Sequence, residues 1–317
     1  MRFSVVIAAY NAASTLGEAI GSVLTQSCQD FEVIVVDDGS SDDTASVAAG
    51  FVEDGRVRVY SQENAGPSAA RNQGIALAQG EYVSMLDSDD LWLPNYLVEM
   101  GRALDDNPKA GFSYTDAWAL EETSGRFLKA TTATLRHRPR TPMSSEQFIA
   151  ALLRHNFVHN SVTVRRAVLG RVGGYNPDMS HSEDYELWLR IVISGFEAVQ
   201  VAGQLAIYRI RPGSLSHNET ALANGLRTVY ESVLELHGAS PKVKALAQAR
   251  LEEMDRRARW DVRIRQRVRR ELGEATRGAR SHRRLRSSPP TCVTEAFPGL
   301  GLGPAASPAS LPTKSSL

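Results

Sequence analysis

Cysteine is scarce in this chain of 317 residues, which has only Cys28 and Cys292, far apart in the sequence. Two such cysteines form neither a disulfide framework nor the spacing of a zinc site, and they suit a reducing compartment. Long apolar runs are also missing, because none approaches the roughly 18 residues of a membrane-spanning helix. The apolar residues 4–10 are too few for the core of a secretion signal and run into Asn11, so they predict a buried strand. These absences predict a cytoplasmic protein.

Formal net charge is zero, but the charges are unevenly placed. Residues 256–286 hold 13 arginines against three acidic residues, so a mainly acidic body is followed by a basic segment. A long Arg-rich helix there is expected either to lie peripherally on anionic lipid at the inner face of the membrane, to be solvated, or to pair with the acidic body of another subunit. Charge alone would permit nucleic-acid binding, but nothing else in the sequence supports it.

The first 90 residues alternate between strand and helix signals. Strands are predicted at residues 4–9, 32–36, 57–60 and 81–86, and helices begin near Ser14, near Ser41 and at Pro67. This alternation predicts an α/β fold with a mostly parallel sheet flanked by helices. No G-x-G-x-x-G follows the first strand, which argues against a dinucleotide oxidoreductase.

The second half of the sequence is more mixed, with extended segments predicted at residues 111–115, 161–165, 197–202 and 205–209 and a helix at 182–195. We expect a main domain over residues 1–218, whose two halves are about 1–110 and 111–218. A helical, Arg-rich extension is expected at 219–286. The Pro-, Ser- and Gly-rich residues 287–317 are expected to be disordered.

Polar residues follow three of the predicted strands directly. They are Tyr10-Asn11, Asp37-Asp38 and Asp87-Ser88-Asp89. Open α/β sheets bind ligands at the edge where the strands have their carboxyl ends. The sequence therefore predicts a ligand site where these loops meet.

Asp87 and Asp89 are two residues apart, so in an extended segment both carboxylates point the same way. Such a pair suits Mg²⁺ or Mn²⁺, which bind one or two carboxylates together with substrate phosphates. The alternative is a solvated acidic turn. Asp37 and Asp38 would accept hydrogen bonds from a base or a ribose, or would form an Asx turn before a helix.

Several other residues allow two interpretations, one functional and one structural. Arg71 near a helix N-terminus is favourable if an anion binds there, and is otherwise a solvent-facing arginine. Asp184, in the first turn of a helix, is a candidate general base or an ordinary dipole partner. Trp188 one turn later would contact a sugar or pack in the core. Arg211 and His217 flank a Gly- and Ser-containing loop that would close over a diphosphate or lie on the surface.

Five segments, taken together and in order, resemble the motifs of family 2 glycosyltransferases. They are residues 4–11, 35–42, 64–72, 86–90 and 183–190. The resemblance extends over about residues 3–216 and implies a Rossmann-like GT-A fold and inversion at the anomeric carbon. Ala8-Ala9 stands where the family often has a proline, and the Arg-rich segment has no counterpart in the pattern.

The resemblance also implies roles for individual residues. It implies a nucleotide-sugar site formed by Ala9, Tyr10, Asp37, Asp38, Gly66, Arg71, Asp87 and Ser88. Asp89 would bind the metal, with Asp87 a second candidate. Apart from the resemblance, the loop at residues 212–216 offers His217 as a weaker candidate ligand for a metal or phosphate. Asp184 would be the base, with Glu183 as the alternative, and Trp188 and Arg211 would lie on the acceptor side.

The implied reaction is transfer of a sugar from a nucleoside diphosphate, UDP or dTDP, to an acceptor hydroxyl with Mg²⁺ or Mn²⁺. The acceptor would be a glycan or a lipid-linked sugar in surface polysaccharide or glycolipid synthesis. Without membrane helices we expect a non-processive hexosyltransferase. The alternatives are a non-catalytic protein that binds sugar nucleotides or polysaccharide, and a sugar nucleotidyltransferase. The nucleotidyltransferase would need a Gly-rich basic loop at residues 10–13, where this chain has Tyr-Asn-Ala-Ala.

Overall fold

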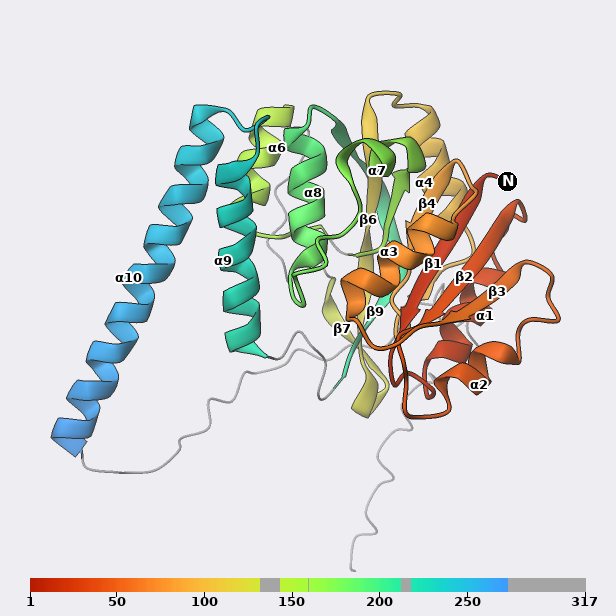
Figure 1. Ribbon diagram of the computed structural model, residues 1–317, viewed down its shortest axis with the longest axis horizontal. Coiled ribbons are helices and arrows are strands. Elements are labelled where there is room, and N and C mark those ends of the chain that lie inside the picture. The colour runs from red at the N-terminus through yellow and green to blue at the C-terminus, as the bar shows by residue number, and fades with distance from the viewer. Residues whose placement is uncertain (132–142, 159, 212–217, 273–317) are drawn as a thin grey trace, which may run out of the picture.

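The first half of the chain alternates regularly between strands and helices (Figure 1). The computed structural model describes residues 1–131, 143–158, 160–211 and 218–272, without the side chains of 129–131 and 260–272. The first elements are β1 (Phe3–Ala9), α1 (Leu16–Leu24), β2 (Phe31–Asp37), α2 (Thr44–Ala49), β3 (Val57–Ser61), α3 (Pro67–Leu77) and β4 (Tyr82–Met85). The alternation predicted from the sequence is therefore present.

The second half adds shorter strands and more helices. They are β5 (Leu91–Trp92), α4 (Tyr96–Asp105), β6 (Ala110–Glu121), the 3₁₀ turn η1 (Glu122–Ser124), β7 (Arg126–Thr131), α6 (Ser145–Leu152), β8 (Val162–Arg165), α7 (Arg166–Val172), α8 (Glu183–Ile193), β9 (Glu197–Ile210), α9 (Glu219–Glu235) and α10 (Pro241–Leu272). The two extended segments expected around residues 197–209 form one strand, whose pairing with β6 shifts register between them.

All described strands join one sheet in the order β3-β2-β1-β4-β8-β6-β9-β5, with β7 paired to β6. The part from β3 to β4 is parallel, whereas β8 pairs antiparallel with both β4 and β6, so the second half of the sheet is mixed. In the sheet, β2 lies on one side of β1 and β4 lies on the other side of it. Loops that leave the carboxyl ends of β1 and β4 therefore diverge, and such a point favours ligand binding.

Both faces of the sheet are covered by helices, because successive residues of a strand point to opposite faces. Val5 and Ile7 of β1 lie in a core shared with α1 and α4, and Val6 lies in a second core shared with α3 and α8. None of the three is more than 1% exposed. The continuous apolar run of β1 follows from burial on both sides.

Helix α3 lies very close to β1. A Cβ at Gly74 would come within 2.3 Å of a γ-methyl of Val6, so only glycine permits this approach. The helix begins at Pro67, after Gly66 in a backbone conformation with φ of 89°. Because α3 runs back along the sheet after β3, its first turns lie at the edge where the strands have their carboxyl ends.

The last two described helices are α9, which lies beside α8, and α10, which packs against α9 (Figure 1). Val229 and Val233 of α9, and Val243, Ala247 and Leu251 of α10, are buried in the core that also includes α8. Among residues placed by the structure, no helix is both long and apolar enough to cross a membrane. The expected disordered tail, residues 287–317, lies outside the described residues.

Candidate functional site

A cavity of about 850 Å³ opens at the carboxyl edge of the parallel strands. One side comes from the loops after β1, β2 and β4 and from the start of α3. The other side comes from Asn156, Asn160, the segment before α8, and α9. The lining residues from the first side are Ala8, Ala9, Tyr10, Asn11, Ala12, Asp38, Asn64, Gly66, Pro67, Ala70, Arg71, Asp87, Ser88 and Asp89.

The loop after β1 is held against the loop after β2. Asn11 has φ of 48°, its amide donates to Ser40 Oγ at 2.9 Å, and its side-chain oxygen accepts from the amide of Ser41 at 2.9 Å. Tyr10, next to it, is 53% exposed at the cavity. An exposed ring on a fixed backbone is well placed to cover a flat ligand.

Asp38 is buried and organises the start of α3. Its carboxylate accepts from the amides of Ala65 and Gly66, both at 2.9 Å, and from Gln62 Nε2 at 2.8 Å. These bonds close the glycine turn that leads into Pro67. Asp38 therefore lines the cavity while shaping its wall. Asp37 does not line it, because its side chain turns to Ser40 and accepts from that residue's amide at 3.2 Å.

Arg71 lies at the centre of the cavity and bridges its two sides. Its guanidinium donates to Asp87 Oδ1 at 2.9 Å and to Glu183 Oε1 at 2.6 Å. Asn160 Nδ2 donates to the same oxygen of Asp87 at 2.7 Å. Burial by itself would lower the pKa of Arg71, but the charges of Asp87 and then Glu183 outweigh it and hold that pKa well above its usual value. Arg71 is therefore a permanent cation.

The carboxyl groups of Asp89 and Asp90 lie in surroundings that disfavour their ionised form. Burial, and then the charge of Asp87, raises the pKa of Asp89 to about 6, although Arg211 lies 3.8 Å away. Burial, and then Asp89, raises the pKa of Asp90 well above its usual value. Carboxylates crowded in this way favour a bound cation.

The carboxylates at the end of β4 fit a divalent ion that is completed by a ligand. Asp87 and Asp89 both line the cavity, and their oxygens are the hard donors that Mg²⁺ and Mn²⁺ take. In the part of the chain that the structure describes, no cluster of three or more His, Cys, Asp or Glu side chains could hold a metal. A metal here would therefore need phosphate or water oxygens, which is the usual arrangement for Mg²⁺.

Glu183 and Asp184 begin α8 and both line the cavity, but their surroundings differ. Glu183 is 9% exposed and is bound to Arg71. Asp184 is half-buried, and one carboxylate oxygen accepts from the amide of Tyr185 at 2.6 Å. Glu183 is therefore an ion-pair partner of Arg71, whereas Asp184 lies beside it at the cavity wall.

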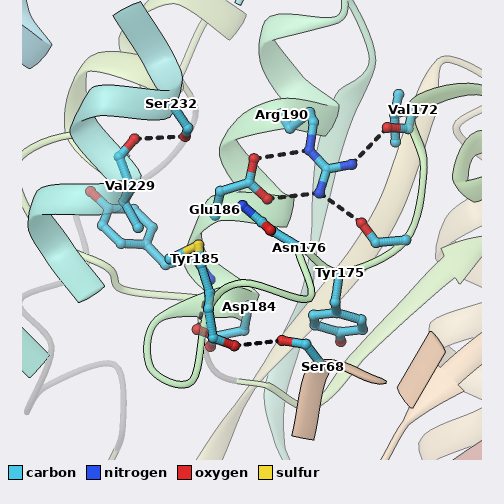
Figure 2. Close-up of polar contacts among 12 residues, drawn as sticks. Ser68, Val172, Tyr175, Asn176, Asp184, Tyr185, Glu186, Arg190, Val229 and Ser232 are labelled. Atoms are coloured by element: carbon cyan, nitrogen blue, oxygen red, sulfur yellow. Dashed lines mark hydrogen bonds and ion pairs between the residues drawn. The ribbon is translucent and has the colours of Figure 1, made fainter. Parts of the chain in front are cut away.

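The segment before α8 is fastened to α3 on one side. Asn72 donates through Nδ2 to the carbonyl of Tyr175 at 2.8 Å, and its Oδ1 accepts from the amide of Tyr175 at 2.7 Å. Ser68 Oγ, one turn earlier, donates to the carbonyl of Met179 at 2.8 Å (Figure 2). A Cβ at Gly174 would come within 2.2 Å of Asn72 Oδ1, so a larger residue there would displace the amide from these hydrogen bonds.

The same segment is fastened to α8 on its other side. Arg190 donates to both oxygens of Glu186, to the carbonyl of Val172 at 2.6 Å and to that of Gly174 at 2.7 Å (Figure 2). Ser182, which leads into Glu183, has φ of 62°, a left-handed conformation unusual for a residue with a side chain. These contacts fix the direction in which α8 presents its first turn to the cavity.

Most residues that the sequence predicts for the site meet in this one cavity. They are Ala9, Tyr10, Asp38, Gly66, Arg71, Asp87, Ser88, Asp89, Glu183, Asp184 and Arg211. Asp37 lies outside the lining, as described above. Trp188 is fully buried and packs on Phe112, so the prediction that it contacts an acceptor is wrong and the core-packing alternative holds. His217 lies outside the described residues.

The sequence reasoning missed several residues that line the cavity or support it. Asn156, Asn160 and His181 belong to segments without a recognisable pattern. Leu222 and Leu226 lie in a predicted helix, where their spacing normally indicates core packing, and only folding brings all five residues to the cavity. Glu186 and Arg190 gave a usable signal, because opposite charges four residues apart in a predicted helix form a pair.

A curled α/β sheet with an acid-rich cavity at the carboxyl ends of its strands is the GT-A fold of glycosyltransferases, and solved structures support this. *Staphylococcus aureus* TarS (residues 1–349), solved with UDP-GlcNAc, aligns over 80% of this chain and 71% of its own, with a TM-score of 0.58 and 19% identity. The mannosyltransferase PcManGT of *Pyrobaculum calidifontis*, solved with GDP-Man and Mn²⁺, aligns over 79% and 69%, with a TM-score of 0.60 and 21% identity. At these identities the likeness shows the fold alone.

Sequence comparison identifies the family. Residues 4–173 match the family described as "Glycosyl transferase family 2". The succinoglycan biosynthesis protein ExoU of *Rhizobium meliloti* is 30% identical over 281 residues, which cover 82% of this chain and 76% of ExoU. The protein belongs to glycosyltransferase family 2. Some relatives are much longer, since an uncharacterised *Rickettsia conorii* glycosyltransferase is matched over only 21% of its length.

The contact between Asn72 and the segment before α8 can be tested with a double-mutant cycle. We expect Asn72→Ala to lower the free energy of unfolding by about 1–3 kcal/mol, because two hydrogen bonds are lost. Gly174→Ala should cost a similar amount, because its new methyl group meets Asn72. In the double variant the methyl group no longer meets the amide, so the loss should be close to that of Asn72→Ala alone. Denaturant unfolding measures all three values.

Gln73→Ala is the matched control, because Gln73 is the exposed neighbour of Asn72 on α3. It should change the free energy of unfolding by less than about 0.5 kcal/mol. If the costs of the two single substitutions simply add, the two residues do not act on each other as described.

Proposed function

We propose that this protein is an inverting, metal-dependent glycosyltransferase that uses a nucleoside-diphosphate sugar, with UDP or dTDP as the nucleotide. It transfers one hexose at a time to an acceptor hydroxyl in the synthesis of a cell-surface polysaccharide or glycolipid. The observation that carries the proposal is the Arg71 bridge, which joins Asp87 on the donor side to Glu183, beside Asp184, within one cavity. The family, and the sugar nucleotides bound by TarS and PcManGT, support the donor class.

The donor would occupy the side formed by the first 90 residues. The exposed ring of Tyr10 would cover the base, and Asp38 and Asp87 would accept hydrogen bonds from base and ribose groups. The diphosphate would extend toward Arg71 and the first turn of α3, whose amides favour an anion. Asp89, with Asp87 beside it, would hold Mg²⁺ or Mn²⁺, which supplies positive charge for the departing diphosphate.

Asp184 would accept the proton of the acceptor hydroxyl as that oxygen attacks the anomeric carbon. A single displacement by an oxygen on the face opposite the diphosphate inverts the configuration at that carbon. Glu183 would act indirectly, because its carboxylate is bound to Arg71 and keeps that cation near the diphosphate. Fixed charges placed before the reaction lower its barrier without reorganisation.

We expect Asp89→Ala to lose sugar-nucleotide turnover by roughly 10²-fold or more, because the leaving diphosphate loses the cation that balances its charge. The measurement is release of UDP or dTDP from a panel of sugar donors with Mn²⁺. Asp106→Ala, an exposed aspartate remote from the cavity, is the control and should retain turnover. Unchanged turnover in Asp89→Ala would remove the metal assignment, provided that its unfolding midpoint matches the parent.

We expect Asp184→Asn to keep donor binding and to lose transfer, because an amide does not accept the acceptor proton. Calorimetric binding of the donor and product release report the two steps separately. Asp178→Asn, an exposed aspartate in the same segment, should leave both unchanged. Retained transfer in Asp184→Asn would show that another residue is the base.

The Arg-rich end of α10 is proposed to bind anionic membrane peripherally, which would bring the enzyme to the inner face where such acceptors are made. Arg256, Arg257 and Arg259 are at the start of this segment and are exposed. Flotation with anionic liposomes should recover the full chain and not a chain that ends at Asp255. Equal recovery of both chains would contradict membrane contact through this segment.

A further inference from the structure

The cavity has a wall that lies outside the segment matching the family. Leu222 and Leu226 belong to α9, whereas the family match ends at residue 173. They face the cavity together with Asn156, Asn160 and His181, on the side opposite Tyr10 and Asp38. This side is next to Asp184, so it is where the acceptor must lie under the function proposed above, on which this inference rests.

Three polar atoms on this side have no hydrogen-bond partner among the residues that the structure describes. They are Asn156 Oδ1, Asn160 Oδ1 and His181 Nε2, and all three are buried. A buried polar atom without a partner costs free energy, so such atoms usually mark a bound water or ligand group. Two amide oxygens and an imidazole nitrogen suit hydroxyl groups, which both donate and accept. Asn160 also donates to Asp87, so this polar group begins at the reaction centre.

The two leucines lie one helical turn apart and form a short apolar strip beside the polar group. Both are half-buried and line the cavity. Their position is fixed by Gly225 between them, where a Cβ would come within 2.5 Å of the carbonyl oxygen of His181. Helix α9 is also anchored by Val229 and Tyr230, which are buried in the core. The strip is therefore a rigid part of the wall rather than a loose end of the chain.

We propose that the acceptor is a sugar with an apolar aglycone, as in a lipid-linked glycoside. The sugar hydroxyls bind Asn156, Asn160 and His181, and the first carbons of the aglycone lie on Leu222 and Leu226. A polysaccharide end would place a second hydrophilic sugar against the leucines, where its hydroxyls would lose hydrogen bonds to water. The order of polar and apolar residues along the wall thus favours a glycoside of a hydrocarbon chain.

The test uses the full chain, the donor that it turns over and Mn²⁺. Acceptors are paired methyl and octyl β-glycosides of glucose, galactose, mannose and N-acetylglucosamine, with the octyl members kept below their micelle concentrations. We expect at least one octyl glycoside to have a KM at least tenfold below that of its methyl partner, measured as release of the nucleoside diphosphate. In Leu222→Gln/Leu226→Gln this octyl preference should fall to about twofold or less, with the KM for the donor unchanged.

Two further variants separate the polar and apolar parts of the wall. Ala223→Gln changes an exposed position on the same turn of α9 and should keep the octyl preference. Asn156→Leu should raise the KM of the methyl and octyl glycosides by the same factor, because it affects only the sugar. The thermal unfolding midpoint of each variant would show that it is folded.

Equal KM values for methyl and octyl glycosides, or no use of any octyl glycoside by an enzyme that releases nucleotide from its donor, would overturn the proposal. So would an octyl preference that survives in the double variant. If the parent chain releases nucleotide from no donor, the proposed function itself fails, and this outcome is distinct from the others.

Discussion

A buried arginine links the two halves of this protein at the site. Arg71 comes from the parallel half of the fold and binds Glu183 from the other half, while its second branch binds Asp87 at the end of β4. With its side chain only 12% exposed, this cation needs both carboxylates, because a buried charge without partners is costly. The bridge therefore fixes the distance between the strand that bears the aspartates and the helix that bears Asp184.

The rest of the site is arranged around that bridge by backbone contacts. Asp38 closes the turn into α3, Asn72 and Ser68 of α3 hold the segment before α8, and Arg190 holds the same segment from α8. Each contact joins a side chain to main-chain groups, so it positions the chain whatever the neighbouring side chains are. Precise placement of the base relative to the donor is worth several kcal/mol of barrier in enzymes.

The sequence was sufficient for the elements and contacts that depend on local order. Local sequence predicts the strand at the apolar run of β1, the helix start at Gly66-Pro67 and the acidic loop after β4. The cavity forms where these loops meet. The antiparallel pairing of β8 could not be derived in this way, because nothing local in residues 162–165 specifies which strands lie beside them. Trp188 shows the same limit. Its place in a helix near the site was predictable, but the face on which it lies depends on Phe112, far away in sequence.

Asp37 and Asp38 look alike in the sequence but have different roles in the structure. Adjacent residues at the end of a strand point to opposite sides, so only one of them can line the cavity. Asp38 does so and Asp37 bonds to Ser40. The wall formed by α9 was not foreseeable either, since leucines four residues apart in a helix normally indicate core packing.

The cavity is assembled from stretches of chain that evolution can alter separately. Its carboxylates and Arg71 lie within the first 184 residues, whereas Leu222 and Leu226 come from a helix more than 30 residues further on, attached through Gly225 and a few core side chains. Drift or recombination in that helix would reshape one wall and leave the other intact. A lineage could in this way acquire new acceptors while keeping its inherited sugar nucleotide.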